Sequence, residues 1–233
     1  MALVMLGPNC AHGATGMAYN YAINWDLAPW DDYDLFNAAE EAYTYQSNMG
    51  YSPRKYEVAW ASDVYANLGG VQIMYLVSHS SPGSIVFRNT GRDQDYSCLR
   101  STAIATLHEH NVADEQAACN HQRALRDRPG EVPTRIVMFQ GCNTADARTT
   151  TDKGLLWASY YEGVDHSAGF EESLLIAFNC ARDFSYGYWE SLSEGNYTVT
   201  AMDAGVSRVR WLHLGIDGNY DSWRYWGTNI RVD

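Results

Sequence analysis

Two short blocks of the sequence each carry one residue of a possible catalytic pair. One block has a histidine, which can act as a base, and the other has a cysteine, which can act as a nucleophile. His79 comes two residues after the apolar run 71–77, and Cys142 comes two residues after the run 135–140. The thiolate is the reactive form of cysteine, so a catalytic thiol needs a proton acceptor nearby. An imidazole titrates near neutral pH and can take that proton. The two blocks therefore predict nucleophilic catalysis by Cys142, with His79 as general base.

The elements around these blocks predict an α/β fold with a mostly parallel sheet and helices on both faces, because short apolar runs alternate with amphipathic segments. Besides 71–77 and 135–140, strands are expected at 2–6, 56–60, 84–87, 155–163 and 211–215. Helices are expected at 35–43, 99–107, 170–192 and 199–209, and irregular structure at 9–30 and 218–233. Active sites of such sheets lie beyond the carboxyl ends of the strands. We therefore expect His79 and Cys142 at one edge of the sheet.

Backbone groups beside the two residues could bind the oxyanion of a tetrahedral intermediate. The N–H groups of Cys142 and of the stretch from Ser80 to Gly83 are the candidates. Gly141 has no side chain and would let a substrate backbone come close.

The blocks Ser78-His79-Ser80 and Gln140-Gly141-Cys142-Asn143-Thr144, each after an apolar strand, resemble the caspase-like cysteine peptidases. That group includes caspases, metacaspases, legumain, clostripain, gingipains and separase. The order of histidine before cysteine agrees, and residues 163–170 are similar to a segment that follows the catalytic cysteine in bacterial relatives. The similar framework covers roughly residues 56–215.

The resemblance implies a single caspase-like domain over residues 1–233, with a central sheet between helices, and an endopeptidase that works through an acyl-enzyme without a cofactor. It carries over His79 as base and Cys142 as nucleophile, and it places the oxyanion at Ser80, Gly83 and the Cys142 amide. Two positions depart from the pattern. Ser80 stands where most relatives have glycine, and Gln140 stands where metacaspases tend to have aspartate.

Composition restricts the partners. The formal net charge of −12 disfavours nucleic acid and anionic membranes, which both need a positive field. A protein or peptide substrate with a basic P1 residue is favoured, and Asp146, Asp165 and Asp203 are the candidates for binding it. The competing interpretation makes these aspartates helix caps or surface charges. The sequence predicts no oligomeric state.

The cysteine count favours a reducing, cytoplasmic location, because five cysteines without a paired spacing do not form a disulfide framework. The first residues lack a basic region typical of a signal peptide, although a leader removed from a longer chain is compatible with them. No stretch approaches the roughly 20 apolar residues of a membrane span.

Other chemistry is weakly supported. His108, His110, Cys119 and His121 lack the i,i+4 histidine pair of a helical metal site, so no metal is expected. No GxSxG elbow accompanies Ser78 or Ser80, and the glycines after His12 lack the lysine of a phosphate loop. Two classes of function stay open: an endopeptidase, and a caspase-like binding or regulatory module without turnover.

The polar loop 146–154 carries two basic residues, Arg148 and Lys153, a few positions after Cys142. Polar segments without apolar anchors are exposed and open to cleavage. If the enzyme prefers basic residues, we expect that the chain can be cleaved after Arg148 or Lys153, either by the enzyme itself or by a partner. The alternative is an ordinary surface loop that is never cut.

Overall fold

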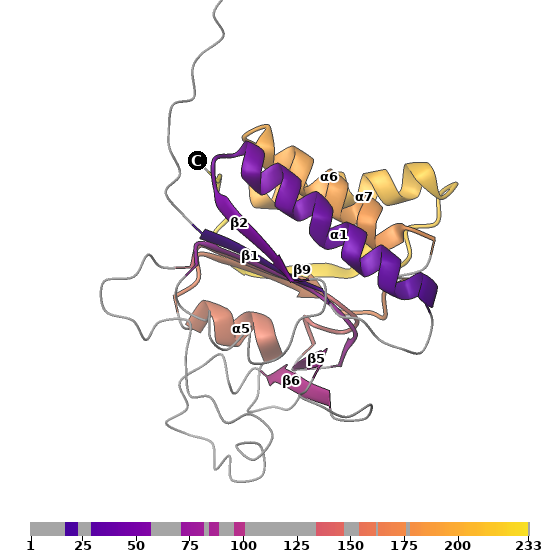
Figure 1. The fold of residues 1–233 in the computed structure, drawn as a ribbon, viewed down its shortest axis with the longest axis horizontal. Helices are drawn as coiled ribbons and strands as arrows, with labels where there is room; N and C mark the ends of the chain where they lie inside the picture. Colours follow the sequence, from indigo (N-terminus) through magenta and orange to yellow (C-terminus); the bar gives the residue numbers. More distant parts are fainter. Residues whose placement is uncertain are drawn as a thin grey trace, which may run out of the picture.

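A computed structural model describes residues 17–22, 29–56, 71–81, 84–88, 96–100, 134–146, 154–161, 163–175 and 178–232. Its centre is a six-stranded sheet with the order β2-β1-β3-β7-β8-β9 (Figure 1). The strands are β1 (Met17–Ala22), β2 (Ser52–Tyr56), β3 (Ile73–Val77), β7 (Ile136–Gln140), β8 (His166–Phe170) and β9 (Trp223–Gly227). Neighbouring strands run parallel except β9, which is antiparallel to β8 at the edge.

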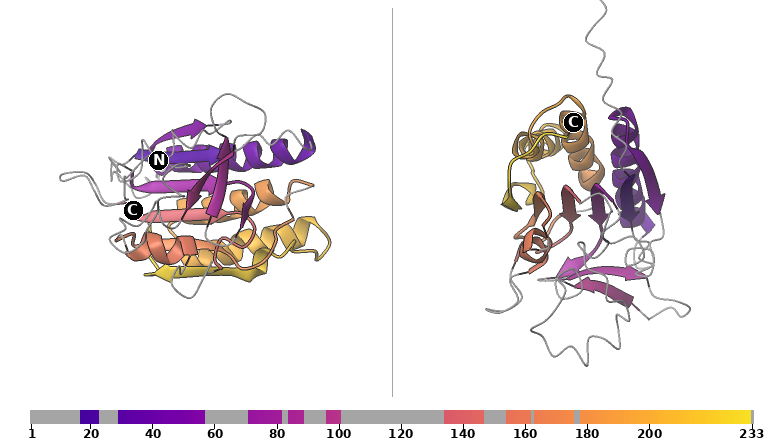
Figure 2. Two further views of the ribbon diagram at one scale, coloured as in Figure 1. Left: turned by 90° about the horizontal axis from the view of Figure 1, so that it is seen from below. Right: turned by 90° about the vertical axis from the view of Figure 1, so that its left-hand side faces the viewer.

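Helices cover both faces of this sheet. On one face lie α1 (Pro29–Asn48), α6 (Cys180–Ser193) and α7 (Thr198–Leu212), and on the other lies α5 (Gly154–Tyr161) (Figure 1). A small antiparallel sheet of β4 (Ser80–Ser81), β5 (Ser84–Arg88) and β6 (Tyr96–Arg100) lies on the α5 side (Figure 2). The short 3-10 helix η1 (Tyr220–Ser222) precedes β9. The predicted α/β class with a mostly parallel sheet is confirmed.

The core lies between the sheet and the three-helix layer. All residues of β3, β7 and β8 are buried, as expected for central parallel strands covered on both faces. Small residues let the helices approach: a Cβ at Gly187 of α6 would lie 2.8 Å from the Ala204 carbonyl oxygen of α7, and one at Gly205 would lie 2.7 Å from the Phe184 ring. Trp189 and Tyr188 fill the space beneath α1 and are fully buried.

Several predicted elements are confirmed. The helix expected at 35–43 lies within α1, the one at 199–209 lies within α7, and the strands at 71–77, 84–87 and 135–140 are β3, β5 and β7. Of the strand expected at 56–60, Tyr56 is the last residue of β2, and residues 57–60 lie outside the described part of the chain.

Six local predictions are wrong. In place of the strand expected at 155–163, residues 154–161 form helix α5, because the buried positions Leu155, Leu156, Ala158 and Ser159 follow a helical period. Residues 211–215 finish α7 and turn, so they form no strand. Helix α6 begins at Cys180 rather than at 170; Phe170 is the last residue of strand β8, and residues 171–175 belong to neither a helix nor a strand. Leu99 lies in strand β6, and strands β1 and β9 occupy segments that were expected to be irregular.

Some expectations fall outside the described residues. These are the strand at 2–6, the histidines between 108 and 121, the oxyanion candidate Gly83, and the loop residues Arg148 and Lys153.

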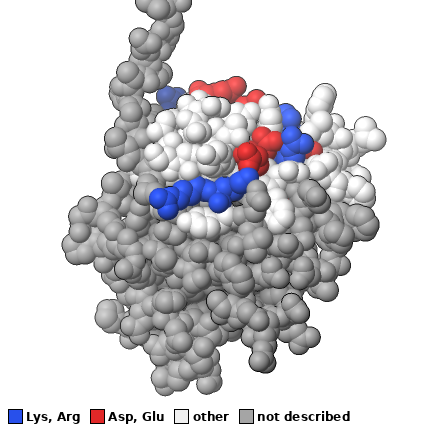
Figure 3. All heavy atoms as spheres, viewed as in Figure 1, with Lys and Arg blue, Asp and Glu red and all other residues white. Residues whose placement is uncertain are grey.

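Charge is mixed over the described part of the helical face, where basic and acidic side chains lie next to one another (Figure 3). Within the described ranges, no helix is both long and apolar enough to cross a membrane.

Candidate active site

The loops that carry His79 and Cys142 leave the sheet side by side. In the parallel register of β3 and β7, Val77 lies opposite Gln140, and the Ser78 N–H continues the ladder by donating to the Gln140 carbonyl at 3.1 Å. His79 and Cys142 are each two residues past the registered pair, and both are half-buried. Adjacent strand ends therefore carry the two residues at one edge of the sheet, and the dyad itself stays a prediction.

Gly141 is needed by the protein's own packing. A Cβ there would lie 2.5 Å from the Ser78 carbonyl oxygen and 2.4 Å from Ser80 Oγ. The missing side chain therefore lets the ends of β3 and β7 come together, and room for a substrate backbone at Gly141 stays a prediction.

The hydroxyl of Ser80 also joins the two loops. It donates a hydrogen bond to the Cys142 carbonyl at 2.5 Å. This hydroxyl is therefore used to position the cysteine loop, and any oxyanion role of Ser80 falls to its backbone N–H.

Cys142 begins a tight turn that presents its sulfur. Asn143 has a φ of 55°, a left-handed conformation that asparagine tolerates better than most residues. Thr144 secures the turn, because its hydroxyl donates to the Phe139 carbonyl at 2.9 Å and accepts the Phe170 N–H at 3.0 Å. Positive φ at a residue with a side chain often marks a functional turn.

Residues 171–175, here called segment 171–175, form one wall beside the sulfur. The Leu174 N–H donates to Cys142 Sγ at 3.3 Å, and the Leu174 carbonyl oxygen lies 3.9 Å from the same atom. The Asn143 N–H donates to the Glu172 carbonyl at 3.1 Å. The main chain of Leu174 therefore offers the sulfur both a donor and an acceptor.

Sequence reasoning missed this wall because it assigned the segment to a helix. The available signal was Asn179, a residue type typical of helix N-termini, which would have started the helix at Cys180. Its side chain makes no cap. The carboxylate of Asp34 on α1 caps α6 instead, accepting the N–H groups of Ala181 at 3.0 Å and Arg182 at 2.8 Å.

A buried polar cluster anchors the strand end beneath Cys142. Gln140 is fully buried, accepts the Tyr75 hydroxyl at 2.5 Å, and donates to the Ala181 carbonyl at 2.9 Å and to Tyr220 Oη at 3.4 Å. Burial, followed by the nearby Asp34 charge, raises the pKa of Tyr220 well above its usual value. Both phenols therefore stay neutral hydrogen-bonding groups, and the cluster links β7 to α6 and η1.

Only one of the three predicted substrate-binding aspartates adjoins the cysteine loop. Asp146 closes the turn, with its N–H donating to the Asn143 carbonyl at 3.2 Å. Desolvation raises the pKa of its carboxyl, and the charge of Glu171 raises it further. Asp165 precedes β8 at the amino end of the strands, opposite Cys142, and pairs with Arg135 at 3.4 Å. Asp203 is exposed on α7, away from the face that packs on the sheet.

Within the described ranges, no group of three or more His, Cys, Asp or Glu side chains is arranged to hold a metal ion.

Comparison with known proteins shows the fold. Neither protein-family models nor curated protein sequences match the chain. Among solved structures, it is similar to the separase of the Saccharomyces cerevisiae separase–securin complex, with 13% identity and a TM-score of 0.52 over 94% of this chain and 12% of that one. It is also similar to caspase-1 from Spodoptera frugiperda, with 7% identity and a TM-score of 0.51 over 92% of this chain and 86% of that one. The architecture is therefore a caspase-like α/β fold.

Proposed function

We propose that this protein is a cysteine endopeptidase in which Cys142 is the nucleophile and His79 the general base. The observation that carries the proposal is the placement of Cys142 Sγ. It follows the carboxyl end of β7, beside the strand end that bears His79, and it receives a backbone N–H at 3.3 Å. The separase and caspase-1 structures described above are cysteine peptidases with a caspase-like fold.

The reaction proceeds as two acyl transfers. The His79 imidazole takes the proton of Cys142, and the thiolate attacks the scissile carbonyl carbon. Backbone N–H groups of Cys142 and of the loop from Ser80 to Gly83 stabilise the tetrahedral oxyanion. The imidazolium gives its proton to the leaving amine as the C–N bond breaks. Water, deprotonated by His79, then attacks the thioester, and the carboxylic acid product leaves with the thiol restored.

The substrate we propose is a protein or peptide with a basic P1 residue. Burial raises the pKa of Asp146, and the nearby charge of Glu171, which also pairs with Arg224 at 2.6 Å, raises it further. A lysine or arginine side chain placed between the two carboxylates would relieve this repulsion through charge-assisted hydrogen bonds. A protein partner also agrees with the separase structure, which is a complex with securin.

A reducing compartment suits this chemistry, and we extend the proposal to it. Within the described part of the chain, Cys142 and Cys180 are both free thiols. A nucleophilic thiol must stay reduced to act.

The second candidate function is a caspase-like module that binds partners without turnover. One contact favours it: the main chain of Leu174 approaches Cys142 Sγ from both its N–H and its carbonyl. That contact occupies a side of the sulfur from which a substrate could enter.

A substrate library separates the two functions. Wild type, Cys142→Ala and Cys180→Ala are incubated with a mixed peptide library, and new termini are read by mass spectrometry. Cys180 is buried and serves as the matched control. Cleavage by wild type and Cys180→Ala, and none by Cys142→Ala, supports the peptidase. Cleavage that survives in Cys142→Ala contradicts it, and folded wild type that cleaves nothing favours the binding module.

A further inference from the structure

The wall beside Cys142 is held from outside by a second segment, residues 217–222, here called turn 217–222. The Leu175 N–H donates to the Gly218 carbonyl at 3.0 Å, and the Asn219 side-chain amide donates to the Ser173 carbonyl at 2.9 Å. Ser222 accepts two N–H groups of the wall, one on its carbonyl at 3.1 Å and one on its hydroxyl at 3.2 Å. The backbone of segment 171–175 is thus fixed along most of its length.

Gly218 and Asn219 of turn 217–222 have φ angles of 61° and 66°. Glycine and asparagine accept this left-handed conformation better than other residues. The local sequence therefore favours the turn, and α7 adds an external constraint.

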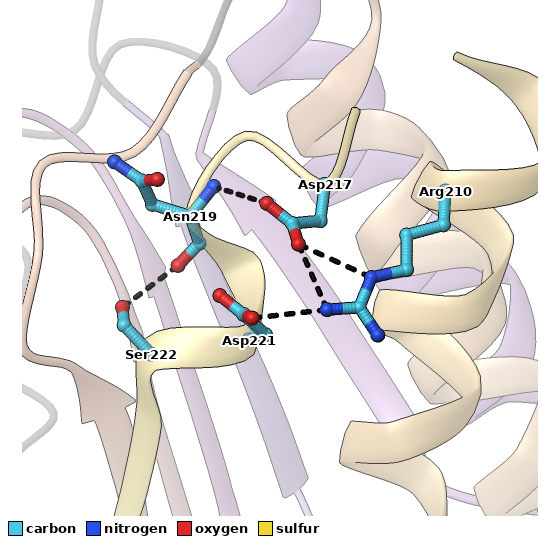
Figure 4. A network of polar contacts seen from close by, with 5 residues as sticks. All are labelled: Arg210, Asp217, Asn219, Asp221 and Ser222. Atoms are coloured by element: carbon cyan, nitrogen blue, oxygen red, sulfur yellow. Dashed lines mark hydrogen bonds and ion pairs between the residues drawn. The ribbon is translucent and has the colours of Figure 1, made fainter. Parts of the chain in front are cut away.

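Arg210, in the last turn of α7, supplies that constraint (Figure 4). Its guanidinium donates to Asp217 at 3.1 Å from Nε and at 2.8 Å from Nη2, and to Asp221 at 2.9 Å from Nη2. The other oxygen of Asp217 accepts the Asn219 N–H at 3.1 Å. The hydrogen bond from Arg210 is the main reason that the pKa of Asp217 lies below its usual value.

We infer that Arg210 is a positioning residue for Cys142. It acts through turn 217–222 and segment 171–175, and it keeps the Leu174 N–H directed at the sulfur. A planar guanidinium suits the task, because it donates in a fixed fork to two carboxylates, whereas lysine provides a single point charge. The inference rests on the proposed function only in assuming that the reactivity of Cys142 matters to the protein.

Loss of Arg210 should change the reactivity of Cys142 rather than the stability of the whole protein. Without Arg210 the turn relaxes, segment 171–175 moves, and Cys142 Sγ loses the hydrogen bond from the Leu174 N–H. The contribution of one hydrogen bond corresponds to roughly two- to tenfold in an equilibrium constant. The alkylation rate of Cys142 at neutral pH should fall by about that factor.

The test is the rate at which iodoacetamide alkylates Cys142, followed by peptide mapping from pH 5 to 10. Arg210→Gln removes the clamp, and Arg210→Lys should restore only part of the rate. Asn219→Gly breaks the link to Ser173 while keeping a residue that accepts positive φ. Arg135→Gln is the matched control, since Arg135 forms an exposed ion pair at the opposite end of β7.

We expect Arg210→Gln and Asn219→Gly to slow alkylation, with Arg135→Gln unchanged. An unchanged rate in Arg210→Gln, or an equal loss in Arg135→Gln, overturns the inference. These are ratios between variant and wild type, so they test the clamp even if a low absolute rate in wild type argues against catalysis.

Discussion

His79 and His166 lie at opposite ends of the same sheet and in opposite environments. His79 follows the carboxyl end of β3 and is half-buried, beside the loop of Cys142. His166 opens β8 at the amino end and is fully buried, stacked on Tyr225 with its ring centroid 5.1 Å away. Its Nδ1 lies 3.0 Å from the Thr228 carbonyl, and its Nε2 has no hydrogen-bond partner.

The difference shows that environment rather than residue type decides what a histidine does. Burial lowers the pKa of His166 to about 4, although the hydrogen bond to Thr228 opposes the shift. The ring is therefore neutral at pH 7 and acts as a packed, hydrogen-bonded plate. A half-buried histidine at the edge of the sheet can instead exchange protons with a substrate and with water.

Replacing each histidine should give the largest contrast. His79→Ala should lower turnover of any substrate found for wild type by roughly 100-fold or more, because it removes the base. His166→Asn keeps a donor near the position of Nδ1 and should retain most turnover at pH 7.5. Steady-state kinetics on both variants checks this. Equal losses of turnover in the two variants would contradict the assignment of His79 as the base.

Stability should depend on pH through His166. Its pKa is lower in the folded than in the unfolded protein, so the unfolded state binds the proton first. The free energy of unfolding should therefore hold above about pH 6.5 and fall as the pH drops towards 4, by up to about 3 kcal/mol. Urea denaturation of wild type and His166→Asn at a series of pH values measures the term. A pH dependence as steep in the variant as in wild type would assign the loss to other groups.

Gly141→Ala should damage the edge that carries His79. The new Cβ would meet the Ser78 carbonyl and Ser80 Oγ at 2.5 Å and 2.4 Å, so the strand ends must separate, at a cost of about 1–3 kcal/mol. Adding Ser80→Ala removes one of the two obstacles, and the double variant should recover part of the loss. Thermal unfolding and turnover of the three variants check this, and full stability of Gly141→Ala would refute the packing.

The smallest effect concerns substrate choice. Asp146→Asn should reduce cleavage of an arginine reporter relative to an alanine reporter, by about tenfold, since one charge-assisted hydrogen bond is lost. Asp203→Asn, on the exposed face of α7, is the matched control and should leave the ratio unchanged. Reporter ratios that do not differ between wild type and Asp146→Asn would remove the basic P1 preference.

Sequence reasoning succeeded where a long apolar run was followed directly by a residue that can do chemistry. The strands before His79 and Cys142 and their placement at one edge follow from buried runs in a parallel sheet. It failed where a short apolar stretch suits either element: residues 155–161 form a helix, although their composition is typical of a strand.

Tertiary contacts explain the other failures. Segment 171–175 is not helical, and turn 217–222, far along the chain, forms hydrogen bonds with its backbone. Asp165 and Asp203 have the right charge for the proposed substrate, but the direction of β8 and the outward face of α7 carry them away from Cys142. No local sequence pattern predicts how far these two aspartates lie from Cys142 in the folded protein.

If His79 activates Cys142, removing the imidazole must slow the reaction of that thiol, and alkylation of Cys142 by iodoacetamide across pH in wild type and His79→Ala measures this directly. Peptide mapping separates Cys142 from the other thiols. We predict faster alkylation of Cys142 in wild type than in His79→Ala at neutral pH, because the base is present only in wild type. Identical pH–rate profiles in the two proteins would contradict it.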